Sequence, residues 1–326
     1  MGIDVPELVR RRAMSNGDAG RRWLDSLPDV VASLAERWNV TIGTPFDSGT
    51  AGYVAEAVDR SGRECVVKIA MPLDTDEHDA FVRSVTAHRL AAGRGCVVVL
   101  DVDTDVPAML MERLGPNLAD LGFSVDRILE TVARTLTTFW RPIEAGHSLP
   151  SGADQARWLA DYIESTWTRL GEPCSRRVID RAVDYCDRRA DAFDPAEAVL
   201  VHGDAHGWNT LDAGDGTFKF VDVEGIRSEP AHDLGVLMRE YNESLLDGDT
   251  ACRTRERAEL LAHRCDVDPT AVWEWGFIER VSTGLANIAE LGADRKSPFL
   301  DVAVRCLDRD APVVNRPGGA QSPTPS

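Results

Sequence analysis

The predicted secondary structure changes from mainly strands to mainly helices near Gly115-Pro116, and this change limits the folds that the sequence can adopt. Before it, short β-rich segments alternate with glycine-containing turns, and one helical segment is inserted among them. After it, amphipathic helical patterns dominate. Strands and helices that are segregated along a chain usually form separate layers or lobes. The pattern therefore predicts an α+β chain, with a small antiparallel sheet followed by a mainly helical part.

The expected elements can be placed by residue number. An amphipathic helical pattern covers the first forty residues. Strands are expected at residues 41–46, 53–58, 64–70, 96–102 and 108–112, with a helix at 76–92. Long helices are expected at 125–141, 154–171, 176–192, 232–246 and 271–290, and residues 200–222 are a β-like interruption. We predict domains at 1–113 and 114–311, and a disordered tail at 312–326, which is rich in Pro, Gly and Ser.

The β-like interruption carries the strongest chemical signal. Asp204 and Asn209 are five residues apart, and a short predicted hairpin returns Asp222 beside Asn209. In phosphoryl transfer from a nucleotide, one carboxylate accepts the proton of the acceptor hydroxyl, while an amide and a second carboxylate hold the metal ions on the phosphates. The spacing predicts Asp204 as the catalytic base and Asn209 and Asp222 as magnesium ligands. His202 is expected to orient this loop.

Lys68 is the second signal, because it lies at the centre of an apolar strand. Burying an unpaired ammonium is costly, so an anionic partner is expected, and the phosphates of ATP would serve. Ser48 and Gly49, in a turn about twenty residues earlier, would lay backbone N–H groups over those phosphates. A strand-edge lysine that reaches water and a plain hairpin turn are the alternatives.

The residues before the change from strands to helices suit a hinge between two lobes. We expect the carbonyl of Glu112 and the N–H of Leu114 to face an adenine ring, because the chain leaves the sheet there. An ordinary linker is the alternative.

A competing interpretation takes His202, Asp204 and His206 as a metal-binding triplet, as in a metallohydrolase. It leaves Asn209, Asp222 and Lys68 without roles, whereas the phosphoryl-transfer interpretation uses all of them. Polar residues satisfied in an ordinary turn would be the purely structural explanation.

Composition restricts the partners. Acidic residues outnumber basic ones by 54 to 36, which gives a formal net charge of −18. This balance disfavours nucleic acids and anionic membranes and favours a small cationic substrate. The seven cysteines lack C-x-x-C spacing, which indicates reduced thiols. Neither a cleavable leader pattern nor a run long enough to span a membrane is found, so we expect a cytoplasmic location.

The chain resembles the aminoglycoside phosphotransferase family, and within it the streptomycin and hydroxyurea phosphotransferase branch. The resemblance runs from about Trp23 to Leu307. The matching segments are Val67-Lys68-Ile69, Leu110-Met111-Glu112-Arg113-Leu114, Val201-His202-Gly203-Asp204-Ala205-His206-Gly207-Trp208-Asn209, Val221-Asp222-Val223-Glu224-Gly225 and Glu229-Pro230-Ala231-His232-Asp233-Leu234.

The resemblance implies a two-lobed protein-kinase-like fold, a monomer or homodimer, and ATP and Mg²⁺ as cofactors. The implied reaction moves the γ-phosphate to a hydroxyl of a small molecule, such as the aminocyclitol streptomycin. A kinase of hydroxyurea or another metabolite, and a catalytically weak nucleotide-binding regulator, are the alternatives. The branch usually has a helix glutamate where this chain has Ser84. We hypothesise that Glu77 or Asp79 compensates.

In this family the acceptor binds to the helical lobe among carboxylates. Glu240, Glu243, Glu274 and Glu279 are the predicted substrate residues. Trp273 and Trp275 flank one of them, and acidic groups with indole faces suit a cation. Solvated helix faces with buried tryptophans are the alternative.

Overall fold

The structure is a computed structural model that describes residues 3–47, 52–71, 75–144, 146–292 and 297–307. Its contacts group the chain into two compact units. The first, here called the sheet unit, comprises Met1–Phe123, Thr138–Leu149 and His202–Ile226. The second, the helical unit, comprises Ser124–Thr137, Pro150–Val201 and Arg227–Ser326. The domain boundary after residue 113 stays a prediction, and the predicted tail lies outside the described residues.

The sheet unit contains the expected antiparallel sheet. Its strands are β1 (Val40–Pro45), β2 (Gly52–Asp59), β3 (Glu64–Ala70), β4 (Val99–Asp103) and β5 (Ala108–Glu112). They lie in the order β1-β2-β3-β5-β4, and every neighbouring pair is antiparallel. The inserted helix α3 (Thr75–Ala91) lies between β3 and β4 in the sequence. The predicted α+β class is confirmed.

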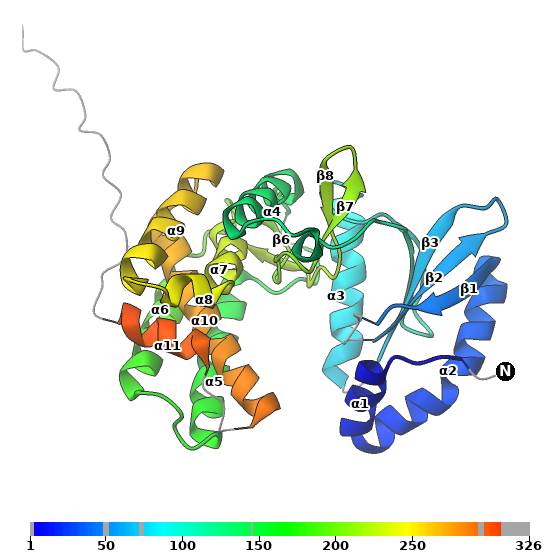
Figure 1. The fold of residues 1–326 in the computed structure, drawn as a ribbon, viewed down its shortest axis with the longest axis horizontal. Coiled ribbons are helices and arrows are strands. Elements are labelled where there is room, and N and C mark those ends of the chain that lie inside the picture. The colour runs from blue at the N-terminus through cyan, green and yellow to red at the C-terminus, as the bar shows by residue number, and fades with distance from the viewer. Residues whose placement is uncertain (1–2, 48–51, 72–74, 145, 293–296, 308–326) are drawn as a thin grey trace, which may run out of the picture. The chain divides into compact units, whose positions relative to one another are not determined.

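Alternate side chains of β3 point either into the core or to the face of the sheet that carries Lys68. Val67 and Ile69 belong to a core that includes residues of α1 (Glu7–Ser15) and α2 (Gly17–Trp38). Successive side chains of a strand point to opposite faces, so Lys68 projects from the other face of the sheet. In Figure 1 the sheet lies between α2 and α3. The lysine is therefore on the face away from α2.

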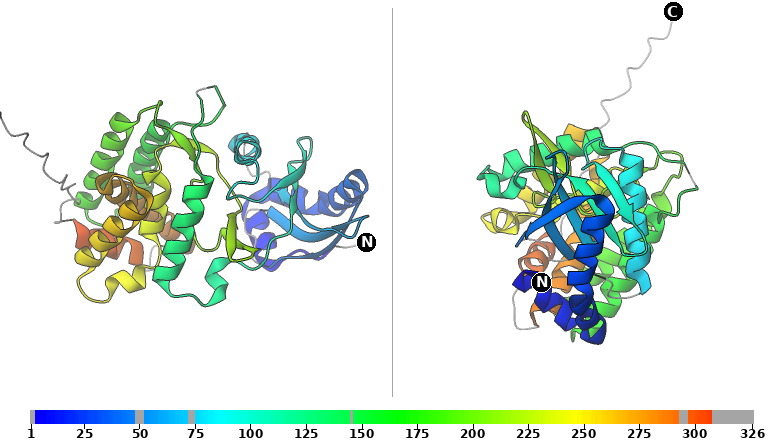
Figure 2. Two further views of the ribbon diagram at one scale, coloured as in Figure 1. Left: turned by 90° about the horizontal axis from the view of Figure 1, so that it is seen from above. Right: turned by 90° about the vertical axis from the view of Figure 1, so that its right-hand side faces the viewer.

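A second, two-stranded sheet is attached to this unit. Its strands are β7 (Thr210–Gly214) and β8 (Thr217–Phe220), beside the main sheet in Figure 2. The N–H of Val97 donates to the Phe220 carbonyl at 2.8 Å, and the N–H of Phe220 donates to the Gly95 carbonyl at 2.9 Å. The N–H of Gly115 donates to the Asp212 carbonyl at 2.7 Å. These main-chain bonds fix the hairpin to the end of the five-stranded sheet.

The helical unit is built around the pairing of two helices. Besides η1 (Leu118–Leu121) in the sheet unit, the remaining elements are α4 (Val125–Phe139), α5 (Gly152–Arg169), α6 (Arg176–Ala192), β6 (Val199–Val201), β9 (Ile226–Ser228), α7 (Ala231–Arg239), α8 (Asn242–Leu246), α9 (Thr250–Cys265), α10 (Pro269–Leu291) and α11 (Pro298–Cys306). A Cβ atom on Gly235 of α7 would lie 2.6 Å from Trp275 Cβ of α10. Only glycine allows so close an approach of the two helices. None of the described helices is long and apolar enough to cross a membrane.

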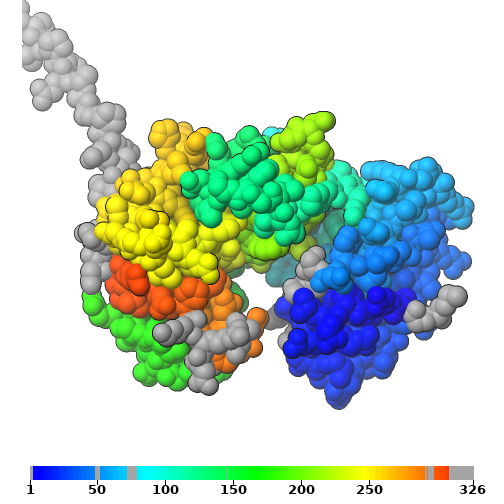
Figure 3. Space-filling view, in the orientation of Figure 1, coloured from blue at the N-terminus to red at the C-terminus, as the bar shows by residue number. Residues whose placement is uncertain are grey.

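The structure differs from the expected helices in one region. The helix predicted at 232–246 is divided, because Tyr241 has a left-handed backbone with φ of 55° between α7 and α8. A left-handed residue cannot continue a right-handed helix. Helices α9 and α11 were not predicted. Together with α8 they occupy one face of the helical unit, which Figure 3 shows in yellow and orange-red.

Candidate active site

His202 fixes the start of the loop that follows β6. Its side chain is fully buried, and its Nε2 lies 2.9 Å from the Val221 carbonyl. A carbonyl only accepts, so Nε2 carries the proton, and Nδ1 accepts from the N–H of Asp204 at 3.1 Å. The ring also packs against Phe220, at 4.9 Å between centroids. Both nitrogens of His202 are thus used within the loop, as its predicted orienting role requires.

Asp204 is held by two neighbours of the same loop. His206 Nε2 lies 3.2 Å from Asp204 Oδ2, and Nδ1 of that ring accepts the N–H groups of Trp208 and Asn209 at 3.2 and 3.3 Å. The Asn209 amide donates to the Asp204 carbonyl at 3.0 Å and to Oδ2 at 3.2 Å. The Asp204 side chain is 31% exposed. It is therefore oriented by fixed donors and still accessible to a ligand.

The histidine contacts bear on the competing metal triplet. His202 and His206 each direct one nitrogen to an acceptor and the other to backbone N–H groups. A metal-ligating nitrogen needs an unshared lone pair, and both lone pairs are already used. The geometry of this loop therefore favours a braced carboxylate over a histidine metal site.

Asp222 meets Lys68 across the sheet unit. Asp222 has a left-handed backbone with φ of 61°, and its Oδ1 accepts a hydrogen bond from Lys68 Nζ. The Asp222 side chain is 44% exposed, and that of Lys68 is 16% exposed. Partial desolvation raises the pKa of Asp222, but the ammonium of Lys68 outweighs it and holds that pKa below its usual range. Asp222 is thus an ionised carboxylate that already binds a cationic group.

Helix α3 packs against the loop that follows Asp222. A Cβ atom on Gly225, which has φ of 78°, would lie 2.8 Å from the Arg83 carbonyl and 3.0 Å from Ala87 Cβ. One turn of the helix therefore touches the backbone just beyond Asp222. Asp79 is exposed, and the side chain of Glu77 lies outside the described residues. The hypothesis that either carboxylate supports Lys68 stays a prediction.

Glu112 has a role that the sequence did not predict. Its Oε1 accepts from Lys219 Nζ at 2.5 Å and from the N–H of Val98 at 2.8 Å. Lys219 belongs to β8, three residues before Asp222, so the pair links the end of β5 to the hairpin. The hairpin predicted before Asp222 includes Lys219, but nothing in the sequence indicated that Glu112 is its partner. Leu114 follows at the chain's exit from the sheet and is buried. Ser48 and Gly49 lie outside the described residues.

The four predicted substrate carboxylates divide into two pairs. Glu274 is 1% exposed and lies 2.7 Å from Arg189 Nε. Glu279 is 5% exposed and accepts from Arg239 at 2.7 Å. These two carboxylates are committed to arginines inside the helical unit. Glu240 is partly buried and Glu243 is exposed, both near the break between α7 and α8.

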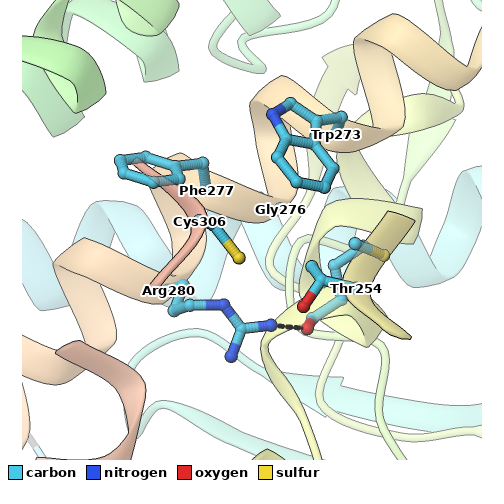
Figure 4. A pocket seen from close by; sticks show the side chains of 7 residues that line it. Thr254, Trp273, Gly276, Phe277, Arg280 and Cys306 are labelled. Atoms are coloured by element: carbon cyan, nitrogen blue, oxygen red, sulfur yellow. Dashed lines mark hydrogen bonds between the residues drawn. The ribbon is translucent and has the colours of Figure 1, made fainter. Parts of the chain in front are cut away.

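The residues at the break between α7 and α8 line one side of a cavity. A cavity of about 410 Å³ is lined by Val125, Tyr241, Asn242, Glu243, Ser244 and Pro298. Arg257 donates to the Glu240 carbonyl and to Ser244 Oγ, and buried Arg280 donates to Asn242 Oδ1 and the Met238 carbonyl. Figure 4 shows Arg280 beside a second cavity, of only about 10 Å³, with one hydrogen bond of its guanidinium dashed. Two guanidinium groups therefore fix the backbone that carries Glu240 and Glu243.

The tryptophans beside Glu274 are structural. Trp273 and Trp275 are 2% and 0% exposed. Their indole N–H groups contact Tyr185 Oη at 3.3 Å and Glu229 Oε1 at 2.8 Å. The expected indole faces are thus packed inside the helical unit. Trp208 of the Asp204 loop, in contrast, is 57% exposed, and the sequence reasoning gave it no role.

Comparison with known proteins gives a family match and two curated relatives. The model of the aminoglycoside/hydroxyurea antibiotic resistance kinases matches residues 37–290. Streptomycin 6-kinase of Streptomyces glaucescens is 24% identical over 88% of this chain and 92% of its own length. Hydroxyurea phosphotransferase of Kitasatospora aureofaciens is 28% identical over 71% of this chain and 67% of its own length.

Solved structures show the same fold. Aminoglycoside phosphotransferase APH(3'')-Id of Streptomyces rimosus, determined with ADP and streptomycin, superposes with a TM-score of 0.52 at 16% identity. The match covers 78% of this chain and 98% of that one. The two-lobed kinase-like class expected from the sequence is therefore confirmed at the level of fold.

Proposed function

Because the chain belongs to the aminoglycoside/hydroxyurea antibiotic resistance kinase family, we propose that it transfers the γ-phosphoryl group of ATP to a hydroxyl of a small cationic antibiotic, with streptomycin as the first candidate. Phosphotransferase activity follows from the family. The nucleotide, the metal and the acceptor are the parts that need tests. The main support for the proposal is a set of contacts within one unit. Lys68 donates to Asp222, and the Asn209 amide donates to Asp204.

The donor atoms around Asp222 suit a magnesium ion. Mg²⁺ prefers carboxylate and amide oxygens together with phosphates and water. Asp222 already binds a cation, the ammonium of Lys68, and it is exposed enough to exchange that partner. The Asn209 amide directs its NH₂ group to Asp204, which leaves Oδ1 as its ligand atom. Asn209 and Asp222 would therefore hold the metal, which offsets phosphate charge when bound.

Asp204 acts on the acceptor hydroxyl. With Oδ2 fixed by His206 and Asn209, its carboxylate has one orientation, and the second oxygen can accept a hydrogen bond from the hydroxyl. Alignment of that hydroxyl is the main contribution of the protein in phosphoryl transfer, and the proton passes to Asp204 as the new bond forms. His206 holds the carboxylate in place through its Nε2. Its role is to position Asp204.

The nucleotide is placed by β3 and the end of β5. We assign Lys68 to the phosphates, because its ammonium projects from the strand face opposite the α2 core. The Glu112 carbonyl and the Leu114 N–H would take the adenine edge. The Lys219–Glu112 ion pair supports this assignment, since it leaves the Glu112 side chain turned to the hairpin and only its backbone for a ligand. Ser48 and Gly49 stay predicted phosphate contacts.

The acceptor site is assigned to the cavity beside α8. Glu243 lines it and offers negative charge to amines or guanidinium groups. Glu240 lies on the same clamped backbone segment, with its Oε1 3.5 Å from Arg239 Nε. We no longer assign Glu274 and Glu279 to the substrate, because both are buried in arginine pairs. The net charge of −18 favours the same class of cationic acceptor.

Radiolabelled ATP and a panel of acceptors test this function. Streptomycin, other aminoglycosides and hydroxyurea are each incubated with the wild-type chain, ATP and Mg²⁺, and labelled product is measured. We expect transfer to streptomycin, and its loss in Asp204→Ala with ATP affinity roughly unchanged. Undiminished transfer by Asp204→Ala would refute the mechanism. Transfer to hydroxyurea alone would move the acceptor assignment to the second relative's class.

A further inference from the structure

His88 has a side-chain atom whose partner is missing. It lies one helical turn after Ser84 on the same face of α3, and the residue is 3% exposed. Its Nδ1 lies 2.7 Å from the Ser84 carbonyl. A carbonyl oxygen only accepts, so Nδ1 carries the ring proton and donates. Nε2 is therefore a lone-pair acceptor in the neutral imidazole.

This acceptor is buried without a hydrogen bond. Within the described part of the chain, His88 Nε2 has no hydrogen-bond partner. Leaving a buried polar atom unpaired is costly, and nearly all such atoms in proteins are paired. Burial also lowers the pKa of His88 to about 4, so the ring stays neutral near pH 7. Such an atom indicates a partner that arrives in another state of the site.

The surroundings identify the missing donor. Helix α3 touches the loop just beyond Asp222, where a Cβ atom on Gly225 would lie 3.0 Å from Ala87 Cβ, and Asp222 pairs with Lys68. After burial, the ammonium of Lys68 also contributes to the lowered pKa of His88. Ionised Asp222 can only accept hydrogen bonds, and the His202 ring already uses both nitrogens on the loop. The ammonium of Lys68 has three N–H groups, one of which Asp222 Oδ1 accepts. Lys68 is the group that can supply a donor.

We propose that His88 is a positioning residue for Lys68, whose ammonium donates to His88 Nε2 when Asp222 turns to a metal ion. This inference rests on the proposed kinase function and deepens it. The imidazole takes the place that the family resemblance gives to a carboxylate at position 84, one turn earlier on the same helix face. Ser84 itself contributes its carbonyl, which sets the tautomer of the ring.

A neutral acceptor changes how the lysine works. A helix glutamate orients a lysine but also offsets its charge, whereas an imidazole orients it without doing so. The full positive charge of Lys68 then acts on the phosphates. The contact of α3 with Gly225 keeps the helix, and so His88, in register with the Asp222 loop. Loss of Nε2 should therefore weaken nucleotide binding and slow turnover together.

Substitutions at position 88 test the proposal. His88→Leu keeps an apolar buried side chain and removes the acceptor, His88→Gln keeps an acceptor oxygen, and Thr86→Ala on the same helix is the matched control. In the absence of any acceptor molecule, calorimetry with Mg-ATP should show an affinity about 10-fold weaker for His88→Leu, in the range seen when a supporting hydrogen bond is lost. His88→Gln and Thr86→Ala should stay within about threefold of wild type.

Steady-state kinetics add a readout that packing alone would not give. We expect kcat of His88→Leu to fall about 10-fold with the acceptor KM unchanged, and Ser84→Glu to restore most of it in the His88→Leu background. Unchanged ATP affinity and kcat in His88→Leu would overturn the proposal, as would equal losses in His88→Leu and His88→Gln. If His88→Leu does not fold, His88→Met replaces it with the same two outcomes.

The calorimetric arm separates this inference from the proposed function. If the wild-type chain phosphorylates no acceptor in the panel, the function fails, and ATP affinity still tests His88. If the wild type is active and His88→Leu is indistinguishable from it, only the inference fails.

Discussion

Carboxylates in the two units have opposite surroundings. Asp204 and Asp222 of the sheet unit have side chains 31% and 44% exposed, and their partners are an imidazole, an amide and an ammonium. Glu274 and Glu279 of the helical unit have side chains 2% and 7% exposed and are held by arginines. An exposed acid whose partner can leave is available for chemistry, whereas a buried acid paired with arginine is part of the framework. Counting acidic residues in a sequence does not distinguish the two.

The largest expected effect comes from removing an exposed carboxylate. Asp222→Asn should lower kcat with the preferred acceptor by about a thousandfold, because a metal ion contributes several kcal/mol to the transition state. The melting temperature should stay close to that of wild type, since the side chain is 44% exposed. Kinase assays and thermal unfolding check both parts. Retained activity would show that Asp222 is not the principal metal ligand.

The buried carboxylates should show the reverse. Glu274→Gln removes the carboxylate that lies 2.7 Å from Arg189, which keeps a longer pair with Glu229 at 3.4 Å, and should destabilise the fold by about 2 kcal/mol. Urea unfolding measures the loss, and kcat of the folded fraction should be nearly normal. Glu243→Gln, at an exposed site, is the control for stability. A large fall in kcat of Glu274→Gln without loss of stability would return this residue to the substrate site.

Loss of the ion pair between Lys219 of the hairpin and Glu112 at the end of β5 should have an intermediate effect. Lys219→Met removes the donor to Glu112 and should raise the KM for ATP about fivefold to tenfold, a range typical of supporting contacts. Glu112→Gln should give a change of similar size, and the double variant should be no worse than either single one. Additive losses in the double variant would show that the two side chains act separately.

The smallest effect concerns protonation. Lys68 holds the pKa of Asp222 below its usual range, so the carboxylate contributes stability above its unfolded pKa that is lost as pH falls through the folded value. In Lys68→Met the pKa of Asp222 should rise toward or above its ordinary value. A carbon-detected NMR titration of labelled aspartate measures it. No rise would mean that the ammonium does not act on this carboxylate in solution.

Local patterns were enough to predict the five strands of the main sheet and the loop that carries Asp204. A β-rich apolar run between glycine-containing turns placed β3 with Lys68 at its centre. The spacing of Asp204, Asn209 and Asp222 is kept in the structure because one loop and one hairpin connect them. The break at Tyr241 was not predictable, because a left-handed residue in a helical pattern depends on the clamp by Arg257 and Arg280.

Contacts between residues that are far apart in the sequence could not be predicted either. Lys219 and Glu112 are 107 positions apart, and only the attachment of the hairpin to the sheet unites them. No sequence pattern pointed to His88, because the feature that distinguishes it is a buried ring nitrogen without a hydrogen-bond partner in the described structure. The sequence predicts Glu274 and Glu279 as substrate residues, because their burial in arginine pairs leaves no pattern along the chain.

The main-chain bonds between the β7–β8 hairpin and the sheet have a consequence for how such enzymes diversify. They place Lys68, Asp204, Asn209 and Asp222 in one unit, while Glu240 and Glu243 belong to the other. With the acceptor site proposed beside α8, substitutions on α8, α9 and α11 should alter which molecule is accepted and leave the proposed nucleotide-binding residues unchanged. A library varied only around the 410 Å³ cavity would draw on this modularity to obtain new acceptor preferences.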